Sequence, residues 1–260
     1  MAFEPSISFI GSGNLAWHLA PAFDNAGYSV KEVYSRDAKH AESLADQLYE
    51  AEVKDTLDFS GSNSRIFVLA VADNAIADVA REIVLPDQSL LIHTSGSVAI
   101  DALSFAAPTA AGVFYPLQLF TKNRKADFKN LPIFMEGTER DAEEVLFEMG
   151  RALGGNIQKL SGEKRLALHL TATIASTFSN HMLEIAHELS VENEIKWDWF
   201  KPLIRETIDK SLSIGAPAHR TQRINEEIAE KHVEYLKEDE KLAELYRIIS
   251  NHIMGGKQIE

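Results

Sequence analysis

The residues that most constrain the fold of this chain lie close to its amino terminus. A short apolar run, residues 7–10, leads directly into Gly11-Ser12-Gly13-Asn14-Leu15-Ala16. Such a run is typical of a buried strand, and the glycines indicate a tight turn followed by a helix. Gly11 permits the turn, Gly13 lets a phosphate group approach the backbone, and Ala16 is small where helix and strand meet. The pattern predicts a dinucleotide-binding turn; a glycine-rich turn without a ligand is the less favoured alternative.

Size and composition fit a globular protein. The chain has 260 residues, 45% of them hydrophobic, which is enough for one large or two ordinary domains. The formal net charge of -13 opposes a phosphate backbone, so we expect no nucleic-acid partner. There is no cysteine, and the nine histidines lack the spacing of metal ligands, so we expect no metal site. Residues 1–5 do not resemble a signal peptide and no apolar run approaches about 18 residues, so we expect a cytoplasmic protein without a membrane segment.

The first 160 residues alternate between strand-like and helix-like segments. Continuous apolar runs are typical of parallel strands that are buried on both faces. The expected strands are residues 28–35, 66–71, 90–93, 112–115, 132–136 and 156–160. Between them we expect helices over residues 14–27, which contain Pro21, over 37–48 with Asp37 as the cap, over 74–83, and over 138–154 with Thr138 as the cap. This order predicts an α/β fold of the Rossmann type, a doubly wound and mainly parallel sheet.

After Ser161 the strand signals stop. Residues 162–191 predict one helix of about thirty residues, far longer than usual. Further helices are expected over residues 198–213, 225–236 and 240–252, with a break at 215–217. We therefore predict a dinucleotide-binding domain over residues 1–160 and an all-helical domain over 161–260.

The end of the second strand indicates which nucleotide binds. NAD-binding sheets usually place an acidic residue there, to bind the ribose hydroxyls. This chain has Ser35 and Arg36 instead. A guanidinium beside a hydroxyl suits a 2′-phosphate, which favours NADP over NAD. The alternative is that Arg36 is a solvated residue at the start of the next helix, where Asp37 adjoins it.

In a doubly wound sheet the ligand lies over the carboxyl ends of the strands. We therefore expect the residues that leave the third and fourth strands to contact the cofactor: Val71, Ala72, Thr94, Ser95 and Gly96. Asp73 is better explained as a helix cap, and a plain tight turn at 94–96 remains open. Gln118, among apolar neighbours after the next strand, is a candidate for a pocket wall or for simple packing.

Five polar residues share one face of the long predicted helix: Arg165, His169, Thr173, Ser176 and Asn180, spaced by four, four, three and four residues. The rest of the helix is largely apolar. Burying unpartnered polar groups costs about 1–3 kcal/mol each, so the stripe should face partners, water or a ligand cleft. A cleft between this helix and the nucleotide domain would make His169 an acid or base and let Ser176 and Asn180 hold the substrate. A structural role for His169 is an equal alternative.

Together these residues resemble one family, the bacterial Rossmann-like proteins with a helical carboxy-terminal domain of unassigned function, DUF2520, described as NADP oxidoreductases. The resemblance spans nearly the whole chain and rests on residues 11–16, 35–36, 93–97 and 116–120, and on His169, Ser176, Phe178 and Asn180. More distantly the chain is similar to pyrroline-5-carboxylate reductase, prephenate dehydrogenase and the β-hydroxyacid dehydrogenases. The resemblance implies an NADP-binding domain, a helical domain similar to the carboxy-terminal domain of 6-phosphogluconate dehydrogenase that commonly mediates homodimer formation, and an active site between the two.

The chain departs from these relatives at three places. Tyr115 stands where the family usually has His before Pro-Leu-Gln, and His169 stands where the β-hydroxyacid dehydrogenases have a catalytic Lys. The family's Gly-Pro…Arg-Gly-Asp segment is reduced here to residues 215–220. Two functions remain as hypotheses. The first is an NADP-dependent oxidoreductase acting on a small carbonyl, imine or hydroxy compound; the second is an NADP(H)-binding sensor or scaffold without hydride chemistry.

Overall fold

The computed structural model describes residues 5–213 and 224–255. The chain divides into two compact units, Met1–Glu184 and Ile185–Glu260. This division falls within the long helix, after its first 23 residues, whereas the predicted domain boundary at Ser161 follows the change in sequence character; that boundary stays a prediction. The predicted break at residues 215–217 lies outside the described residues.

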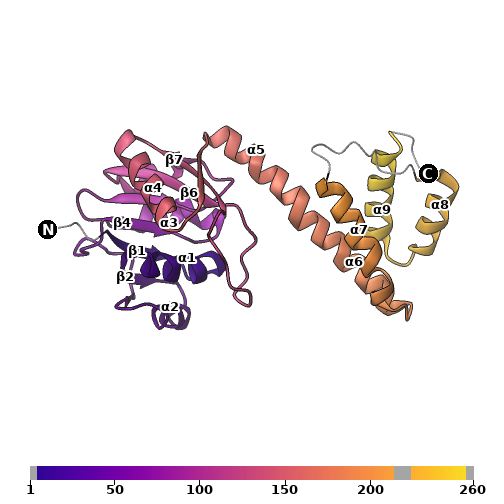
Figure 1. The fold of residues 1–260 in the computed structure, drawn as a ribbon, viewed down its shortest axis with the longest axis horizontal. Helices are drawn as coiled ribbons and strands as arrows, with labels where there is room; N and C mark the ends of the chain where they lie inside the picture. The colour runs from indigo at the N-terminus through magenta and orange to yellow at the C-terminus, as the bar shows by residue number, and fades with distance from the viewer. Residues whose placement is uncertain (1–4, 214–223, 256–260) are drawn as a thin grey trace. The chain divides into compact units, whose positions relative to one another are not determined.

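The first unit contains an eight-stranded sheet in the order β3-β2-β1-β4-β5-β6-β7-β8. Several of its strands are labelled in Figure 1. The strands β1 to β6 run parallel, as buried apolar runs predict, whereas β7 pairs antiparallel with β6 and parallel with β8. The strand order reverses at β1, which places β1 and β4 side by side at the centre. The strands are β1 (Ser6–Ile10), β2 (Ser29–Tyr34), β3 (Glu52–Lys54), β4 (Ile66–Leu69), β5 (Leu90–His93), β6 (Ala110–Pro116), β7 (Pro132–Gly137) and β8 (Asn156–Lys159).

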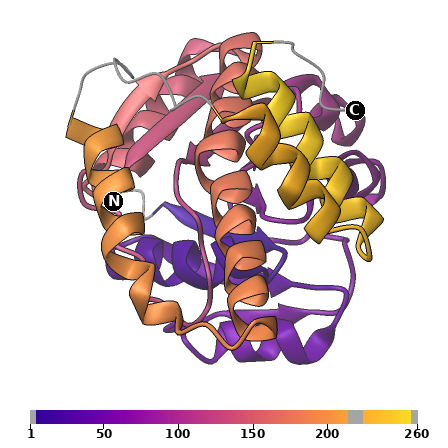
Figure 2. The same cartoon turned by 90° about the vertical axis from the view of Figure 1, so that its right-hand side faces the viewer.

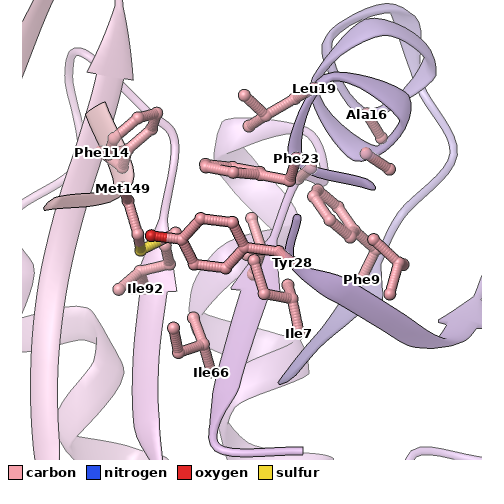
Figure 3. Packing of buried hydrophobic residues seen from close by; sticks show 14 of the residues in the cluster. Ile7, Phe9, Ala16, Leu19, Phe23, Tyr28, Ile66, Ile92, Phe114 and Met149 are labelled. Carbon is pink, nitrogen blue, oxygen red and sulfur yellow. The ribbon is translucent and has the colours of Figure 1, made fainter. Parts of the chain in front are cut away.

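Helices cover both faces of this sheet because alternate strand residues point to opposite sides. Ile66 and Val68 pack in one hydrophobic core with α1 (Asn14–Asn25), α2 (Ala38–Ala45) and α4 (Arg140–Ala152). Phe67 and Leu69 pack in a second core with α3 (Ile76–Glu82), which follows the short 3-10 turn η1 (Asp73–Ala75), and with η2 (Ile100–Ala106). In the first core Phe23 of α1 meets Phe114 of β6 with ring centroids 5.7 Å apart (Figure 3). The fold is thus a Rossmann-type three-layer arrangement.

Several local predictions can be compared directly with the structure. Asp37 caps α2 as predicted, accepting a hydrogen bond from the Lys39 N–H at 3.0 Å. Pro21 lies inside one continuous helix, α1. The predicted cap at Thr138 is wrong, because α4 begins one residue later, after Glu139. The Thr138 hydroxyl instead bonds to the backbone of Ala111, which ties the start of α4 to β6.

The long helix forms over the predicted residues, with one irregularity. It consists of α5 (Gly162–Ala172), a π-helical segment η3 (Thr173–Phe178) and α6 (Ser179–Glu192). A π-helical turn has i→i+5 hydrogen bonds and therefore holds an extra residue. Nothing in the sequence pattern predicted this segment.

The remainder of the described chain is helical, as predicted. It comprises η4 (Trp197–Trp199), α7 (Lys201–Ser213), α8 (Glu226–Tyr235) and α9 (Glu240–Ile253). The helices α8 and α9 lie side by side as an antiparallel pair (Figure 2), in which His232 and the Tyr246 hydroxyl are 2.7 Å apart. Across the described residues, none of the helices combines the length and the apolar character that a bilayer crossing requires.

Candidate active site

The glycine turn has the geometry of a phosphate cradle. Gly11 has φ +109°, and a Cβ there would lie 2.3 Å from the Ala70 carbonyl oxygen, so no other residue fits. A Cβ at Gly13 would meet nothing closer than 3.9 Å, so the space in front of this residue is open. Gly13 precedes α1, and no side chain caps the helix. The N–H groups at the start of α1 are therefore free to bind an anion such as a pyrophosphate.

Residues at the end of β2 complete the cradle. The Ser12 and Ser35 hydroxyls are hydrogen-bonded at 2.9 Å, which joins the glycine turn to the end of β2. Arg36 is exposed. The neighbouring carboxylate of Asp37 is engaged as the α2 cap, and no ion pair of Arg36 is found among the described residues. Its guanidinium is thus available for a 2′-phosphate, and these residues fit an NADP cofactor.

The turn after β4 differs from the prediction. Asp73 does not cap the following helix; the residue before η1 is Ala72, and no side chain caps it. The Asp73 carboxylate instead accepts a hydrogen bond from the Ser97 hydroxyl at 2.6 Å. The turns after β4 and β5 are therefore joined, and Val71 and Ala72 lie at the same edge of the sheet as Thr94 and Ser95.

The turn after β5, residues 94–98, is held in one conformation from within. The Ser95 hydroxyl accepts hydrogen bonds from the N–H groups of Ser97 and Val98, both at 3.0 Å. His93, the last residue of β5, is completely buried, and its Nδ1 accepts a hydrogen bond from the Ser95 N–H at 3.1 Å. Burial and the nearby Arg165 guanidinium lower the pKa of His93 to about 4, against smaller opposing effects of Asp73 and the Ala99 backbone. His93 is therefore a neutral hydrogen-bond acceptor that fixes the turn.

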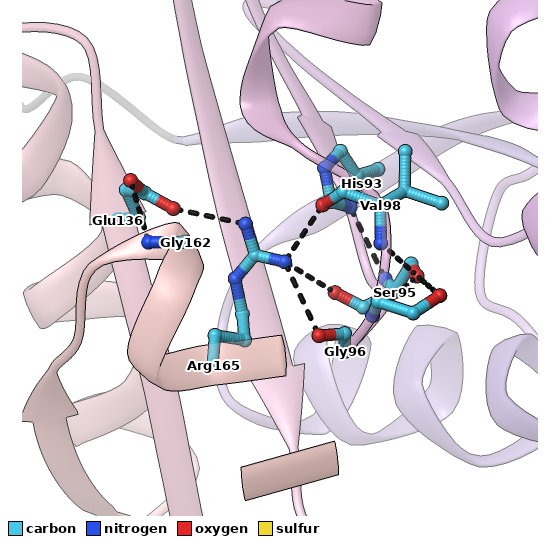
Figure 4. A network of polar contacts seen from close by, with 8 residues as sticks. His93, Ser95, Gly96, Val98, Glu136, Gly162 and Arg165 are labelled. Carbon is cyan, nitrogen blue, oxygen red and sulfur yellow. Dashed lines mark hydrogen bonds and ion pairs between the residues drawn. The ribbon is translucent and has the colours of Figure 1, made fainter. Parts of the chain in front are cut away.

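Arg165 anchors this turn from the opposite side (Figure 4). Its side chain is fully buried, and one terminal nitrogen donates to the carbonyls of Ser95 at 3.2 Å, Gly96 at 3.4 Å and Val98 at 2.7 Å. The other terminal nitrogen pairs with Glu136 of β7 at 2.9 Å. Arg165 thus joins the 94–98 turn, β7 and α5. The stripe residue predicted to face a ligand, water or a partner has found protein partners.

One turn further along α5, His169 contacts Tyr115. The His169 Nδ1 and the Tyr115 hydroxyl are 3.2 Å apart. Gly96 makes this pairing possible, because a Cβ there would lie 2.7 Å from both the His169 Nδ1 and Tyr115 Cζ. Burial, followed by the negative charge of Asp73, raises the pKa of Tyr115, while Arg165 acts in the opposite direction. The phenol therefore keeps its proton at neutral pH.

Tyr115 and His169 both line a pocket of about 300 Å³. Its lining residues come from the end of β6 and from α5 and η3: Tyr115, Leu117, Gln118, Leu119, His169, Ala172, Thr173, Ala175, Ser176 and Thr177. The Thr173 and Ser176 hydroxyls donate to the carbonyls of His169 and Ala172, at 2.9 and 2.7 Å. Their hydrogens are occupied, so toward the pocket these oxygens act as acceptors.

The predicted catalytic residues are only partly brought together. His169 and Ser176 line the pocket, but Asn180 does not and instead bonds to Glu184 at 2.6 Å. The predicted stripe assumes 3.6 residues per turn throughout, whereas the extra residue of the π-helical segment rotates the residues after it by about 100°. Sequence reasoning did not assign Tyr115 a role; its place at the end of β6, among the other strand ends, was the available signal.

Two family descriptions match the chain. Residues 6–96 match the NADP oxidoreductase family described as coenzyme F420-dependent, and residues 131–253 match the domain of unknown function DUF2520. The structure of BF3122 from Bacteroides fragilis, to which NADP oxidoreductase activity is ascribed, is 31% identical in sequence. The match covers 96% of this chain and 98% of that one, with a TM-score of 0.86.

Two matches with lower identity share the fold. A reductive aminase from Aspergillus terreus, in complex with NADPH and ethyl-5-oxohexanoate, is 16% identical over 99% of this chain and 97% of its own, with a TM-score of 0.65. An imine reductase from Myxococcus stipitatus, in complex with NADP⁺, is 16% identical over 96% of this chain and 92% of its own, with a TM-score of 0.61. No curated protein matches the sequence.

Proposed function

Because this chain belongs to the family of Rossmann-like NADP oxidoreductases with a DUF2520 region, we propose that it is an NADP-dependent reductase of a small carbonyl or imine compound. The observation that carries the proposal is the Tyr115–His169 pair, which lies beside the 94–98 turn and opens into a pocket. Such a pocket at the carboxyl edge of a doubly wound sheet is where substrates of these folds bind.

The cofactor would be held at the cradle described above. The pyrophosphate would bind at Gly11, Ser12 and Gly13 and at the N–H groups of Asn14 and Leu15. The 2′-phosphate would be bound by Ser35 and Arg36, which supports NADP rather than NAD. Val71, Ala72, Thr94, Ser95 and Gly96 would follow the cofactor along the strand ends. When bound, NADPH supplies the hydride that a reductase adds to the substrate carbon.

The chain's own contribution to the chemistry is a proton. Reduction of a carbonyl or imine adds one hydride to carbon and one proton to oxygen or nitrogen. The Tyr115 hydroxyl gives that proton to the substrate, since the alkoxide or amide anion is a far stronger base than a phenolate. The His169 Nδ1–H, 3.2 Å away, stabilises the phenolate by a hydrogen bond, and the phenolate then takes a proton from solvent to restore the phenol. Ser176 and Thr173 accept hydrogen bonds from the substrate.

Absorbance of NADPH with a panel of aldehydes, ketones and imines tests the proposal. We expect turnover by the wild type, and a loss of about a hundredfold in kcat for Tyr115→Phe and for His169→Ala. His181→Ala is the control, because this histidine lies on the same helix, is exposed and does not line the pocket. Equal rates for wild type and both site variants would overturn the catalytic assignment. NADPH binding without turnover of any compound would favour the sensor or scaffold.

We also infer a homodimer. The long helix has large apolar side chains at intervals of four residues, and all are 41–58% exposed: Leu166, Leu170, Ile174, Phe178 and Met182. Large apolar side chains exposed in a row along one helix are typical of a protein–protein interface. A second copy of the chain is the partner we propose for it.

A further inference from the structure

We infer that the pocket beside His169 takes uncharged carbonyl or imine compounds and discriminates against compounds that carry a carboxylate. This inference rests on the proposed reductase function and specifies its substrate class. Among the described residues, the pocket lining has neither Lys nor Arg, and also neither Asp nor Glu. A carboxylate that leaves water for such a site loses hydration without gaining an ion pair.

Two of the hydroxyl groups that line the pocket reinforce this preference. Thr173 and Ser176 use their hydrogens within the helix, so they present acceptor oxygens to the pocket. A carboxylate is itself an acceptor only, and it would face these oxygens without a hydrogen between them. A neutral compound with an N–H or O–H group can donate to the same oxygens. These two hydroxyl oxygens thus favour a neutral compound over a carboxylate.

The buried guanidinium of Arg165 does not supply the positive charge that the pocket lining lacks. The terminal nitrogens of Arg165 donate to three backbone carbonyls and to Glu136, and the side chain is fully buried. Both terminal nitrogens are therefore engaged by the protein, and Arg165 is not among the residues that line the pocket. The pKa of Tyr115 is consistent with this, because the negative charge of Asp73 affects it more than the positive charge of Arg165 does.

The charge of the whole chain acts in the same direction. A formal net charge of -13 repels anions as they approach, which lowers their rate of association. NADP itself is an anion, but it has dedicated partners at the start of α1 and at Arg36. The pocket beside His169 has no equivalent among its lining residues.

An ester and its parent acid provide the test, because they differ in charge and little in shape. We propose to measure kcat/KM with NADPH for methyl 4-formylbenzoate and for 4-formylbenzoate, and to measure binding of both compounds by calorimetry. We expect the ester to be preferred at least tenfold. Equal or better turnover of the acid, or equal or tighter binding of it, would overturn the inference and leave the proposed reductase function intact. Absence of turnover with either compound and with the wider panel would instead count against the function, and the binding data would still test the charge preference.

A variant that adds a cation makes the test sharper. Leu119 lines the pocket and is 63% exposed, so a longer polar side chain is tolerated there. Leu119→Arg is expected to reduce the preference for the ester at least threefold, and Leu119→Gln, of similar polarity but neutral, should leave it unchanged. If both variants change the ester-to-acid ratio equally, charge is not the cause of the preference.

Discussion

Arg165 is the fully buried member of the polar stripe. Its guanidinium makes four hydrogen bonds to the protein, so of the three predicted environments, which were partners, water or a ligand cleft, it has the first. Removing one partner of a buried ion pair leaves the other charge and several carbonyls unsatisfied. Arg165→Met should therefore lower the free energy of unfolding by about 3 kcal/mol in urea denaturation.

Arg151→Met is the matched control for this prediction. Arg151 pairs with Glu148 at 3.3 Å on the surface, where the two side chains are 66% and 62% exposed. Such exposed ion pairs contribute less than about 1 kcal/mol to the free energy of unfolding. A similar loss of stability in both variants would show that Arg165 is not the anchor of the 94–98 turn.

Substitutions of the two glycines in the cradle should have different effects, one on the stability of the fold and the other on NADPH affinity. Gly11→Ala places a Cβ 2.3 Å from the Ala70 oxygen at a positive φ, so we expect a lower melting temperature. Gly13→Ala meets no atom closer than 3.9 Å and should keep the melting temperature while NADPH affinity falls at least tenfold. Thermal unfolding and calorimetric titration measure the two effects. Unchanged NADPH affinity in Gly13→Ala would place the phosphates elsewhere.

Arg36 should decide between the two coenzymes. Its exposed guanidinium has no ion pair among the described residues, and hydrogen bonds to a charged group contribute about 1.5–3 kcal/mol. Arg36→Ala should therefore weaken NADPH binding at least tenfold and leave NADH binding nearly unchanged. Titration of wild type and variant with both coenzymes measures this. A parallel change for NADPH and NADH would contradict a 2′-phosphate contact.

His93 should make stability depend on pH. Its pKa is about 4 in the folded protein and near 6.5 when exposed, so only the unfolded chain takes up this proton between these values. The stabilising contribution is complete above pH 6.5 and is lost as pH falls, by about 3 kcal/mol at pH 4. His93→Gln should flatten the dependence of the unfolding free energy on pH in this range. An unchanged slope would mean that another group titrates.

Single residues were predicted well where their partners are local. Asp37 bonds to an N–H two residues away, and its role as a cap could be predicted from its position alone. Thr138 and Asp73 have the same preference for helix starts, but each found a partner far along the chain, Ala111 and Ser97. Tertiary contacts of this kind have no local signal, which also explains why Tyr115 and Glu136 were not assigned.

At the scale of elements, the strength of the hydrophobic pattern decided what could be predicted. The apolar run Leu90–His93 forms β5 with the expected bounds, because a strand buried on both faces needs apolar residues throughout. The short edge strand β3 has exposed residues and no such run, so it was missed. The antiparallel direction of β7 depends on its connection to β6 and leaves no mark in composition.

At the scale of the whole molecule, the proposed homodimer can be tested directly. A charge within the apolar stripe should prevent association, so we expect Leu170→Asp and Phe178→Asp to be monomeric by sedimentation at concentrations where the wild type is dimeric. Tyr49→Asp is the control, since Tyr49 is 94% exposed and lies away from the stripe, between α2 and β3. A monomeric wild type, or a dimer that tolerates both charges, would exclude this surface.

The π-helical segment gives the long helix a means of changing one end without the other. Deleting one residue within Thr173–Phe178 would restore a uniform α-helical pitch and turn residues 179–184 by about 100° around the axis. The proton-donating pair lies before that point and would keep its contacts. Loss of a single codon here would therefore re-aim the side chains of residues 179–184 and reshape the pocket wall formed by residues 173–177, while the Tyr115–His169 contact stays in place.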